Sequence, residues 1–184
     1  MYNISANTHK KYFKRGIEMS EKIKPFVKWA GGKGNLIPQL NNFFPNELKN
    51  GEIHRYIEPF VGGGAVLIDI LQNYGEQEAY AFDINIDLIN SYNVIKNNLG
   101  ELITNLKHIE TEYLHLEQEG RKNYFYNTRE EYNAHKLQEN EQNIQKAAQF
   151  IYLNKTCFNG LYRVNKNGDF NGPMGSYKNP PICD

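Results

Sequence analysis

Residues 53–64 read Ile-His-Arg-Tyr-Ile-Glu-Pro-Phe-Val-Gly-Gly-Gly, a strand-like stretch that leads directly into three glycines. Apolar residues at helical spacing follow in residues 65–73 and predict a helix. Residues 78–82 predict a second strand, which ends at Asp83. A strand, a glycine turn, a helix, a strand and an acid in this order are typical of half of a doubly wound sheet. The predicted fold class is therefore α/β, with a partial Rossmann-like sheet.

The glycine turn and the acid that follows it suit a ligand with a sugar and an anionic group. Gly62, Gly63 and Gly64 let a ligand approach the backbone because no Cβ stands in the way. The amides at the start of the next helix can hold an anion. Asp83 lies about 20 residues further on, where an acid can accept hydrogen bonds from ribose hydroxyls. A tight structural turn with a capping acid would show the same residues, so this pattern alone leaves both interpretations open.

Two other nucleotide-binding patterns fit poorly. A phosphate loop requires a glycine five positions before Gly32 and a hydroxyl residue after Lys33. Val27 and Gly34 occupy those two positions. The three adjacent glycines also lack the G-x-G-x-x-G spacing of a dinucleotide-binding turn.

Composition narrows the class of protein. The chain has 184 residues, 40% of them hydrophobic, and 21 basic residues balance 21 acidic ones. Zero net charge argues against a protein that coats DNA through bulk charge, but not against a local basic patch. Cys157 and Cys183 give no metal-binding spacing, so no metal site is predicted. No apolar run approaches the roughly 20 residues of a membrane span, and no secretory signal is present, so a cytoplasmic location is expected.

The chain divides into three predicted parts. Residues 1–23 are polar and predict a mobile leader, in which Met19 is an alternative start. Residues 24–98 form the α/β part, which includes a short helix from Asn35 to Phe44. Residues 99–184 predict a helical region whose pattern breaks at 117–129 and resumes at 141–154. A hairpin then follows, with Asn167-Gly168 as its two-residue turn.

Four segments of the chain resemble motifs of one family. Phe26-Val27-Lys28-Trp29-Ala30-Gly31-Gly32-Lys33 resembles the N-terminal cofactor motif of the Dam-like DNA adenine-N6 methyltransferases. Residues 56–64 look like that family's main cofactor loop, residues 80–85 like its next motif, and residues 158–163 like its target-reading hairpin. The four occur in the family's order, which makes chance matching improbable.

The resemblance implies a cofactor, S-adenosylmethionine. It implies that Trp29, Lys33, Asp83 and Phe60 contact the cofactor, with the Gly62 to Gly64 turn beneath its amino-acid end. The chemistry agrees, because a cationic sulfonium favours an aromatic neighbour. The methionine carboxylate favours a lysine and turn amides, and an acid suits the ribose. Without the other motifs, Trp29 would be interpreted as a core residue and Lys33 as a surface residue.

The resemblance also implies double-stranded DNA as the partner. A guanidinium can bind guanine O6 and N7 in a bidentate way, which makes Arg163 the candidate for base readout. Side chains near the flipped adenine wedge or stack, and phosphate contacts set position. The further candidates are Lys28, Phe158, Asn159, Leu161 and Pro173 for the DNA surface, and Lys166 and Lys178 for phosphates. The family's usual target is adenine within GATC, in restriction–modification, repair or regulation.

The family's catalytic motif is not found. Dam-like enzymes hold the target amine with Asp-Pro-Pro-Tyr, whose carboxylate and backbone accept its hydrogens while the aromatic ring stacks on the base. Asn179-Pro180-Pro181-Ile182 lacks the aromatic residue and is predicted to be a loop. No catalytic residue is assigned. The chain is expected to lack a C-terminal half, to leave its first strand unpaired on one side, to be poorly stable or prone to aggregation, and to be inactive alone.

Two alternatives stay open. A methyltransferase of RNA or of a small molecule would share the glycine turn and Asp83 but would leave the 158–163 hairpin unexplained. A non-catalytic remnant that binds DNA or cofactor would account for the missing motif.

Overall fold

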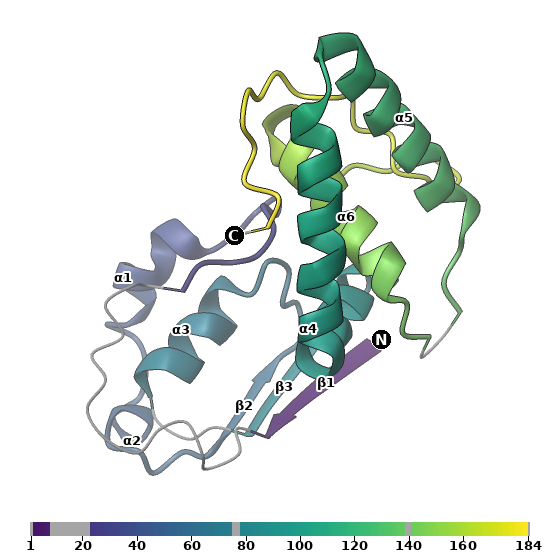
Figure 1. Ribbon diagram of the computed structural model, residues 1–184. Coiled ribbons are helices and arrows are strands. Elements are labelled where there is room, and N and C mark those ends of the chain that lie inside the picture. The colour runs from purple at the N-terminus through teal and green to yellow at the C-terminus, as the bar shows by residue number, and fades with distance from the viewer. Residues whose placement is uncertain (1, 8–22, 75–77, 139–140, 184) are drawn as a thin grey trace. The chain divides into compact units, whose positions relative to one another are not determined.

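A small sheet carries the first half of the chain. The computed structural model describes residues 2–7, 23–74, 78–138 and 141–183 (Figure 1). The described strands are β1 (Tyr2–Asn7), β2 (Arg55–Glu58) and β3 (Glu78–Asp83), in the order β1-β3-β2. Strands β2 and β3 run parallel, with Arg55 opposite Glu78 and Glu58 opposite Ala81. Helix α3 (Ala65–Asn73) connects them. This is a mixed α/β structure, as predicted.

Strand β1 lies inside the segment that was predicted to be a leader. Tyr2, Ile4 and Ala6 alternate with polar residues, which is the period of a strand, and this short signal was overlooked. The remainder of the predicted leader, residues 8–22, lies outside the described residues, as do residue 1 and the candidate start at Met19.

The predicted helix from Asn35 to Phe44 is replaced by shorter elements. Residues Gly34–Leu36 form a 3-10 turn, and α1 covers only Ile37–Leu40. Asn35 lies within the turn and caps nothing. A further helix, α2 (Asn46–Lys49), begins after Pro45, whose backbone is extended.

The contacts group the described chain into two units. The sheet unit comprises the described residues from Asn3 to Pro25 and residues Gly31–Ile84, and the helical unit comprises Phe26–Ala30 and the residues from Asn85 onward. The division at Ile84 differs from the predicted boundary at 98. That boundary instead coincides with a kink, because Asn98 has non-helical angles within α4 (Ile86–His115).

Three helices form the core of the helical unit. They are α4, α5 (Gln118–Ala134) and α6 (Ile144–Thr156), and Figure 1 shows α6 alongside α4. Ala147, Ala148 and Ile151 of α6 are buried, as predicted. The predicted break at 117–129 is wrong, because α5 is helical there. It buries only Phe125, Thr128 and Tyr132, one narrow stripe on an otherwise polar helix.

The predicted hairpin is present but its turn differs. Bridges join Cys157 to Met174 and Val164 to Phe170. The turn begins at Asn165, whose carbonyl accepts from Gly168 N at 3.1 Å, so the loop has three residues and not two. The Asn165 side chain accepts from the amides of Asn167 and Asp169 and fixes this turn. Gly168 has φ +77°, the left-handed conformation that a three-residue hairpin loop requires.

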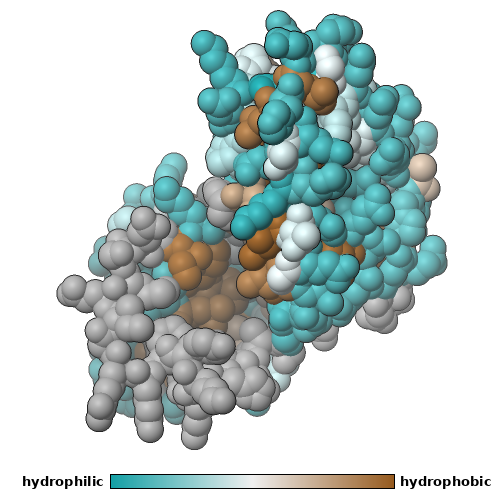
Figure 2. Space-filling view, viewed as in Figure 1, coloured by the Kyte–Doolittle hydropathy of each residue, from teal (hydrophilic) through white to brown (hydrophobic). Residues whose placement is uncertain are grey.

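No helix within the described ranges is both long enough and apolar enough to cross a membrane. Figure 2 shows a largely hydrophilic surface on the visible face of the helical unit.

Candidate cofactor and DNA sites

The glycine turn of the sheet unit is tied to the acid of the next strand. Val61 N donates to Phe82 O at 2.9 Å, and Gly62 N donates to Asp83 Oδ2 at 3.0 Å. Asp83 is only 8% exposed. Gly62 (φ +49°) and Gly64 (φ +77°) both have positive φ, so the turn needs residues without a Cβ. The structure therefore brings together the predicted glycines and the predicted acid.

Two apolar side chains stand exposed beside this turn. Phe60 lies between β2 and the glycine turn and is 81% exposed. Ile84 directly follows Asp83 and is 91% exposed. Exposed apolar residues at the carboxyl ends of adjacent parallel strands suit a flat, apolar ligand group, because ligands of such sheets bind at that edge. Ile84 was missed in the sequence, although an apolar residue directly after a strand-ending acid could have indicated it.

Glu58, at the end of β2, was also missed. Burial raises the pKa of its carboxyl to about 7. Hydrogen bonds from Tyr56 and from the Leu67 amide, and the charge of Lys33, lower the pKa but do not offset the effect of burial. Tyr56 donates to Glu58 Oε2 at 3.0 Å. A carboxyl group with this pKa beside a predicted cofactor turn is a candidate functional group. Sequence could not identify it, because its burial depends on α3 packing.

Lys33 is exposed and belongs to the sheet unit. Its ammonium donates to Gly31 O at 2.8 Å. Its charge lowers the pKa of Glu58, against the larger effect of burial.

Trp29 belongs to the helical unit. Its partly buried indole stacks on Tyr162, with ring centroids 5.3 Å apart and planes at 19°, and lies 6.2 Å from the Phe150 ring. Since Lys33 and Asp83 belong to the sheet unit, the convergence of all three on one ligand stays a prediction.

Lys28 lies against the base of the hairpin. Its backbone N donates to Asn154 Oδ1 at 2.9 Å, and Asn154 Nδ2 donates back to Lys28 O and to Gly160 O. Gly160 has φ +65°, and a Cβ there would lie 2.5 Å from Lys28 Cδ. The amide of Asn154 thereby joins the Trp29 segment to the hairpin.

The hairpin presents the predicted DNA-contacting side chains together. Phe158, Asn159, Leu161, Arg163 and Pro173 are all exposed. Phe158 N donates to Pro173 O at 2.9 Å, which joins the two ends of the hairpin. Asn159 has φ +59°, unusual for a residue with a Cβ and typical of a turn held by its surroundings.

Arg163 is oriented by one neighbour. Its Nε donates to Asn171 Oδ1 at 2.9 Å and its Nη2 to Asn171 O at 3.1 Å. Because a guanidinium has five N–H donors, these two bonds fix its plane while others still point outward. The arrangement suits a bidentate contact to a base edge.

The stretch Asn179 to Ile182 is a loop, as predicted. Ile182 is buried, and its N donates to Glu110 Oε1 of α4 at 2.9 Å. Within the part of the chain that the structure describes, no cluster of His, Cys, Asp and Glu could hold a metal ion.

Comparisons with known proteins identify the family of the chain. The family model for the D12 class of N6 adenine-specific DNA methyltransferases matches residues 29–183. A type II methyltransferase of Methanocaldococcus jannaschii, M.MjaIII, is 51% identical over 162 residues, 88% of this chain and 55% of that protein. A DNA adenine methylase of Haemophilus influenzae is 37% identical over 90% of this chain and 51% of its own length. A DNA N-6-adenine-methyltransferase of Escherichia phage P1 is 40% identical over 91% of this chain and 21% of its own length.

The chain thus spans about half the length of the first two relatives. The family match covers most of this chain, including Trp29, the glycine turn and the hairpin. The chain belongs to the D12 class of N6 adenine-specific DNA methyltransferases.

Proposed function

We propose that this chain supplies the cofactor-binding and DNA-reading parts of an enzyme that methylates adenine N6 in duplex DNA. S-adenosylmethionine is the methyl donor, and GATC is the target. The relatives are named as methyltransferases and DNA adenine methylases, which supports this chemistry. In this proposal the sheet is a partial Rossmann-like sheet, and the hairpin-bearing region that follows is a target-recognition insertion.

The observation that carries the cofactor assignment is the bond from Gly62 N to the buried carboxylate of Asp83. A buried carboxylate held by a turn amide at the carboxyl end of a strand suits a ribose diol. Phe60 and Ile84 supply exposed apolar surface for the adenine ring. Lys33 is placed to hold the carboxylate of the methionine end. When bound, the cofactor supplies an electrophilic methyl group on a sulfonium, and Trp29 provides the aromatic face that such a cation favours.

The DNA assignment depends on the hairpin. Arg163, fixed by Asn171, reads a guanine edge, and Leu161 and Phe158 contact the step from which the adenine is extruded. Lys28 and Pro173 flank them, Asn159 supplies a polar group, and Lys166 and Lys178 contact phosphates.

Calorimetry with S-adenosylmethionine tests the cofactor site. Asp83→Asn removes the charge but keeps the shape, and we expect the Kd to rise at least about tenfold, since a charged hydrogen bond is worth roughly 1.5–3 kcal/mol. Glu78→Gln is the matched control, because Glu78 is an acid on the same strand that pairs with Arg55. An unchanged Kd in Asp83→Asn, or no binding by the wild-type chain, would contradict the proposal.

Duplex binding tests the DNA site. We expect a GATC duplex to bind more tightly than one with a single substituted base pair, and Arg163→Ala to reduce that discrimination by about 1–3 kcal/mol. Lys166→Ala should weaken both duplexes alike. Equal weakening of both duplexes in Arg163→Ala would show a phosphate contact instead of base readout.

A further inference from the structure

Tyr162 occupies an unusual position between the cofactor segment and the DNA-reading residues. It lies between Leu161 and Arg163 in the hairpin, and its ring stacks on Trp29. The Tyr162 ring also packs against Phe150 and Phe170, whose ring centroids lie 5.2 Å and 5.6 Å from its own. All of these residues belong to the helical unit. The stack therefore connects the predicted cofactor aromatic to the backbone that carries Arg163.

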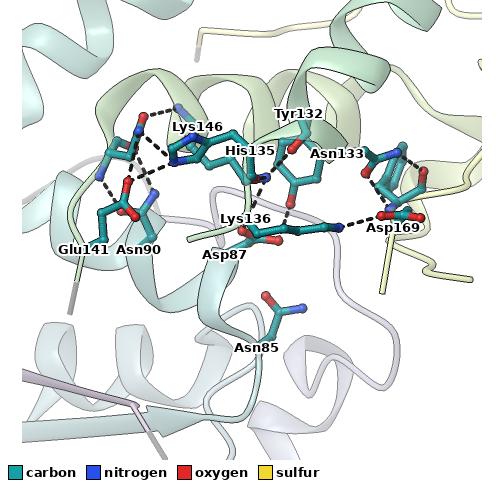
Figure 3. Close-up of polar contacts among 12 residues, drawn as sticks. Asn85, Asp87, Asn90, Tyr132, Asn133, His135, Lys136, Glu141, Lys146 and Asp169 are labelled. Carbon is teal, nitrogen blue, oxygen red and sulfur yellow. Dashed lines mark hydrogen bonds and ion pairs between the residues drawn. The ribbon is translucent and has the colours of Figure 1, made fainter. Parts of the chain in front are cut away.

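The Tyr162 hydroxyl is held by a polar cluster at the start of α4. It donates to Asp87 Oδ2 at 3.3 Å, and the hydroxyl of Tyr132 donates to the same oxygen at 2.6 Å. Lys146 is only 3% exposed, and its ammonium lies 3.9 Å from Asp87 Oδ1. Figure 3 shows Asp87, Tyr132 and Lys146 together, with Asn85 nearby. These contacts fix the rotation of the Tyr162 ring.

The titration behaviour agrees with a donor role for both phenols. Burial, and then the charge of Asp87, raise the pKa of Tyr162 to about 12. Burial raises the pKa of Tyr132 well above its usual value as well, with Tyr162 and Asp87 adding to it. Both hydroxyls therefore keep their protons near neutral pH and donate to the carboxylate.

A second connection runs parallel to the stack. Asn154 bonds the backbone of Lys28, next to Trp29, and also bonds the carbonyl of Gly160 in the hairpin. Asn154 is fully buried. Since residues Lys28 and Trp29 and the hairpin share both a ring stack and a buried amide, a shift of one breaks these contacts unless the other follows.

We propose that Tyr162 is a positioning residue that couples the cofactor to DNA. It fixes the plane of the Trp29 indole and links that plane to the hairpin, so S-adenosylmethionine and duplex each strengthen the binding of the other. This inference rests on the proposed function, since it assumes that Trp29 contacts the cofactor and the hairpin contacts DNA. Such coupling is reciprocal, and a factor of about 5–150 is usual.

The coupling can be measured as a ratio: the Kd for S-adenosylmethionine without duplex divided by its Kd with saturating GATC duplex. We expect a ratio of at least about 5 for the wild-type chain. Trp29 is the only tryptophan, so its emission reports directly on the indole that stacks on Tyr162. We expect duplex alone to shift this emission.

Three variants separate coupling from stability. Tyr162→Leu removes the stack, and its ratio should fall to about 1 because each binding event then acts independently. Tyr162→Phe keeps the ring but releases it from Asp87, and its ratio should fall below that of the wild type. Tyr132→Phe is the matched control, because it removes the other hydroxyl on the same oxygen of Asp87, 3.5 Å from the Tyr162 hydroxyl, and leaves the Tyr162 side chain intact. This variant should have a lower midpoint of urea unfolding than the wild type but the same ratio of Kd values.

The outcomes discriminate. A wild-type ratio near 1, with both ligands bound, refutes the coupling but leaves the proposed function standing. Failure of the wild-type chain to bind either ligand refutes the proposed function itself. An equal loss of ratio in Tyr162→Phe and Tyr132→Phe would show a purely structural role. If Tyr162→Leu does not fold, that pair of phenylalanine variants decides the question alone.

Discussion

At the scale of single residues, Glu58 makes the stability of the sheet unit depend on pH. The carboxyl ionises near its ordinary value of 4.5 when unfolded, but burial holds its folded pKa at about 7. The folded state therefore keeps a proton that the unfolded state has lost, and the stabilisation that is full below about pH 4.5 is lost as the pH rises through 7.

We predict that Glu58→Gln flattens this dependence. The wild-type free energy of unfolding should fall between about pH 5 and pH 7.5, and the variant should lose that slope. Urea unfolding at several pH values measures it. Glu78→Gln is the control, because Tyr80 and Arg55 lower the pKa of Glu78, so that carboxyl titrates below this window. If the free energy of unfolding of Glu58→Gln still falls with pH over this range, another group causes the dependence.

Gly160 gives a second prediction for a single residue. Gly160→Ala should cost about 1–3 kcal/mol, because it combines positive φ with a Cβ in contact with Lys28. Gly168→Ala shares the positive φ but meets nothing within 4 Å, so it should cost less. Urea unfolding compares the two. Equal losses would show that backbone strain alone matters at Gly160.

Single residues also show what sequence could supply. The order of turn and acid predicted that Gly62 and Asp83 belong to one site, because parallel strands bring their carboxyl ends to one edge. Glu58 and the partner of Arg163 could not be predicted in this way. Their roles depend on which side chains pack or bond beside them, and no local pattern records that.

At the scale of elements, the hairpin depends on a side-chain tether. Asn171 holds Arg163 through its side chain and its carbonyl, while Asn171 N separately donates to Arg163 O at 2.9 Å. Replacing the side chain therefore leaves the backbone pairing in place.

We predict that Asn171→Ala weakens sequence discrimination more than affinity. Losing one of the two bonds lets the guanidinium rotate, so the advantage of GATC over a mismatched duplex should fall by about 1 kcal/mol. Fluorescence anisotropy with both duplexes measures this. Asn165→Ala, which alters the turn and not Arg163, is the control. Discrimination that is unchanged in Asn171→Ala would mean that Arg163 needs no tether.

The helices that are rich in apolar residues were predicted well, and the mostly polar helix was not. Helix α3 occupies the predicted residues, and α6 buries its predicted face. Helix α5 was missed because so little of it faces the core. The hairpin turn was placed too late because an asparagine side chain, and not the Asn-Gly pair, fixes it. Tertiary contacts outweighed the local pattern at α5, whereas a local side-chain bond outweighed the Asn-Gly signal at the turn.

At the scale of the whole molecule, we expect the binding of cofactor and DNA to occur without methyl transfer. The sequence contains the glycine turn, the acid and the reading hairpin, but it contains no Asp-Pro-Pro-Tyr to hold the target amine. The amine of adenine is a weak nucleophile, so its positioning accounts for a large part of any rate enhancement.

We therefore predict that the 184-residue polypeptide binds S-adenosylmethionine and GATC duplex but transfers no methyl group. Incorporation of label from the methyl-labelled cofactor into duplex measures transfer, with the M. jannaschii relative as the positive control. Binding is scored by calorimetry on the same preparation, which excludes misfolding as the cause of silence. Transfer by this polypeptide would show that another group, outside the family's usual motif, can hold the amine. Asn179 would be the first residue to replace, since its side-chain amide precedes two prolines in the same order.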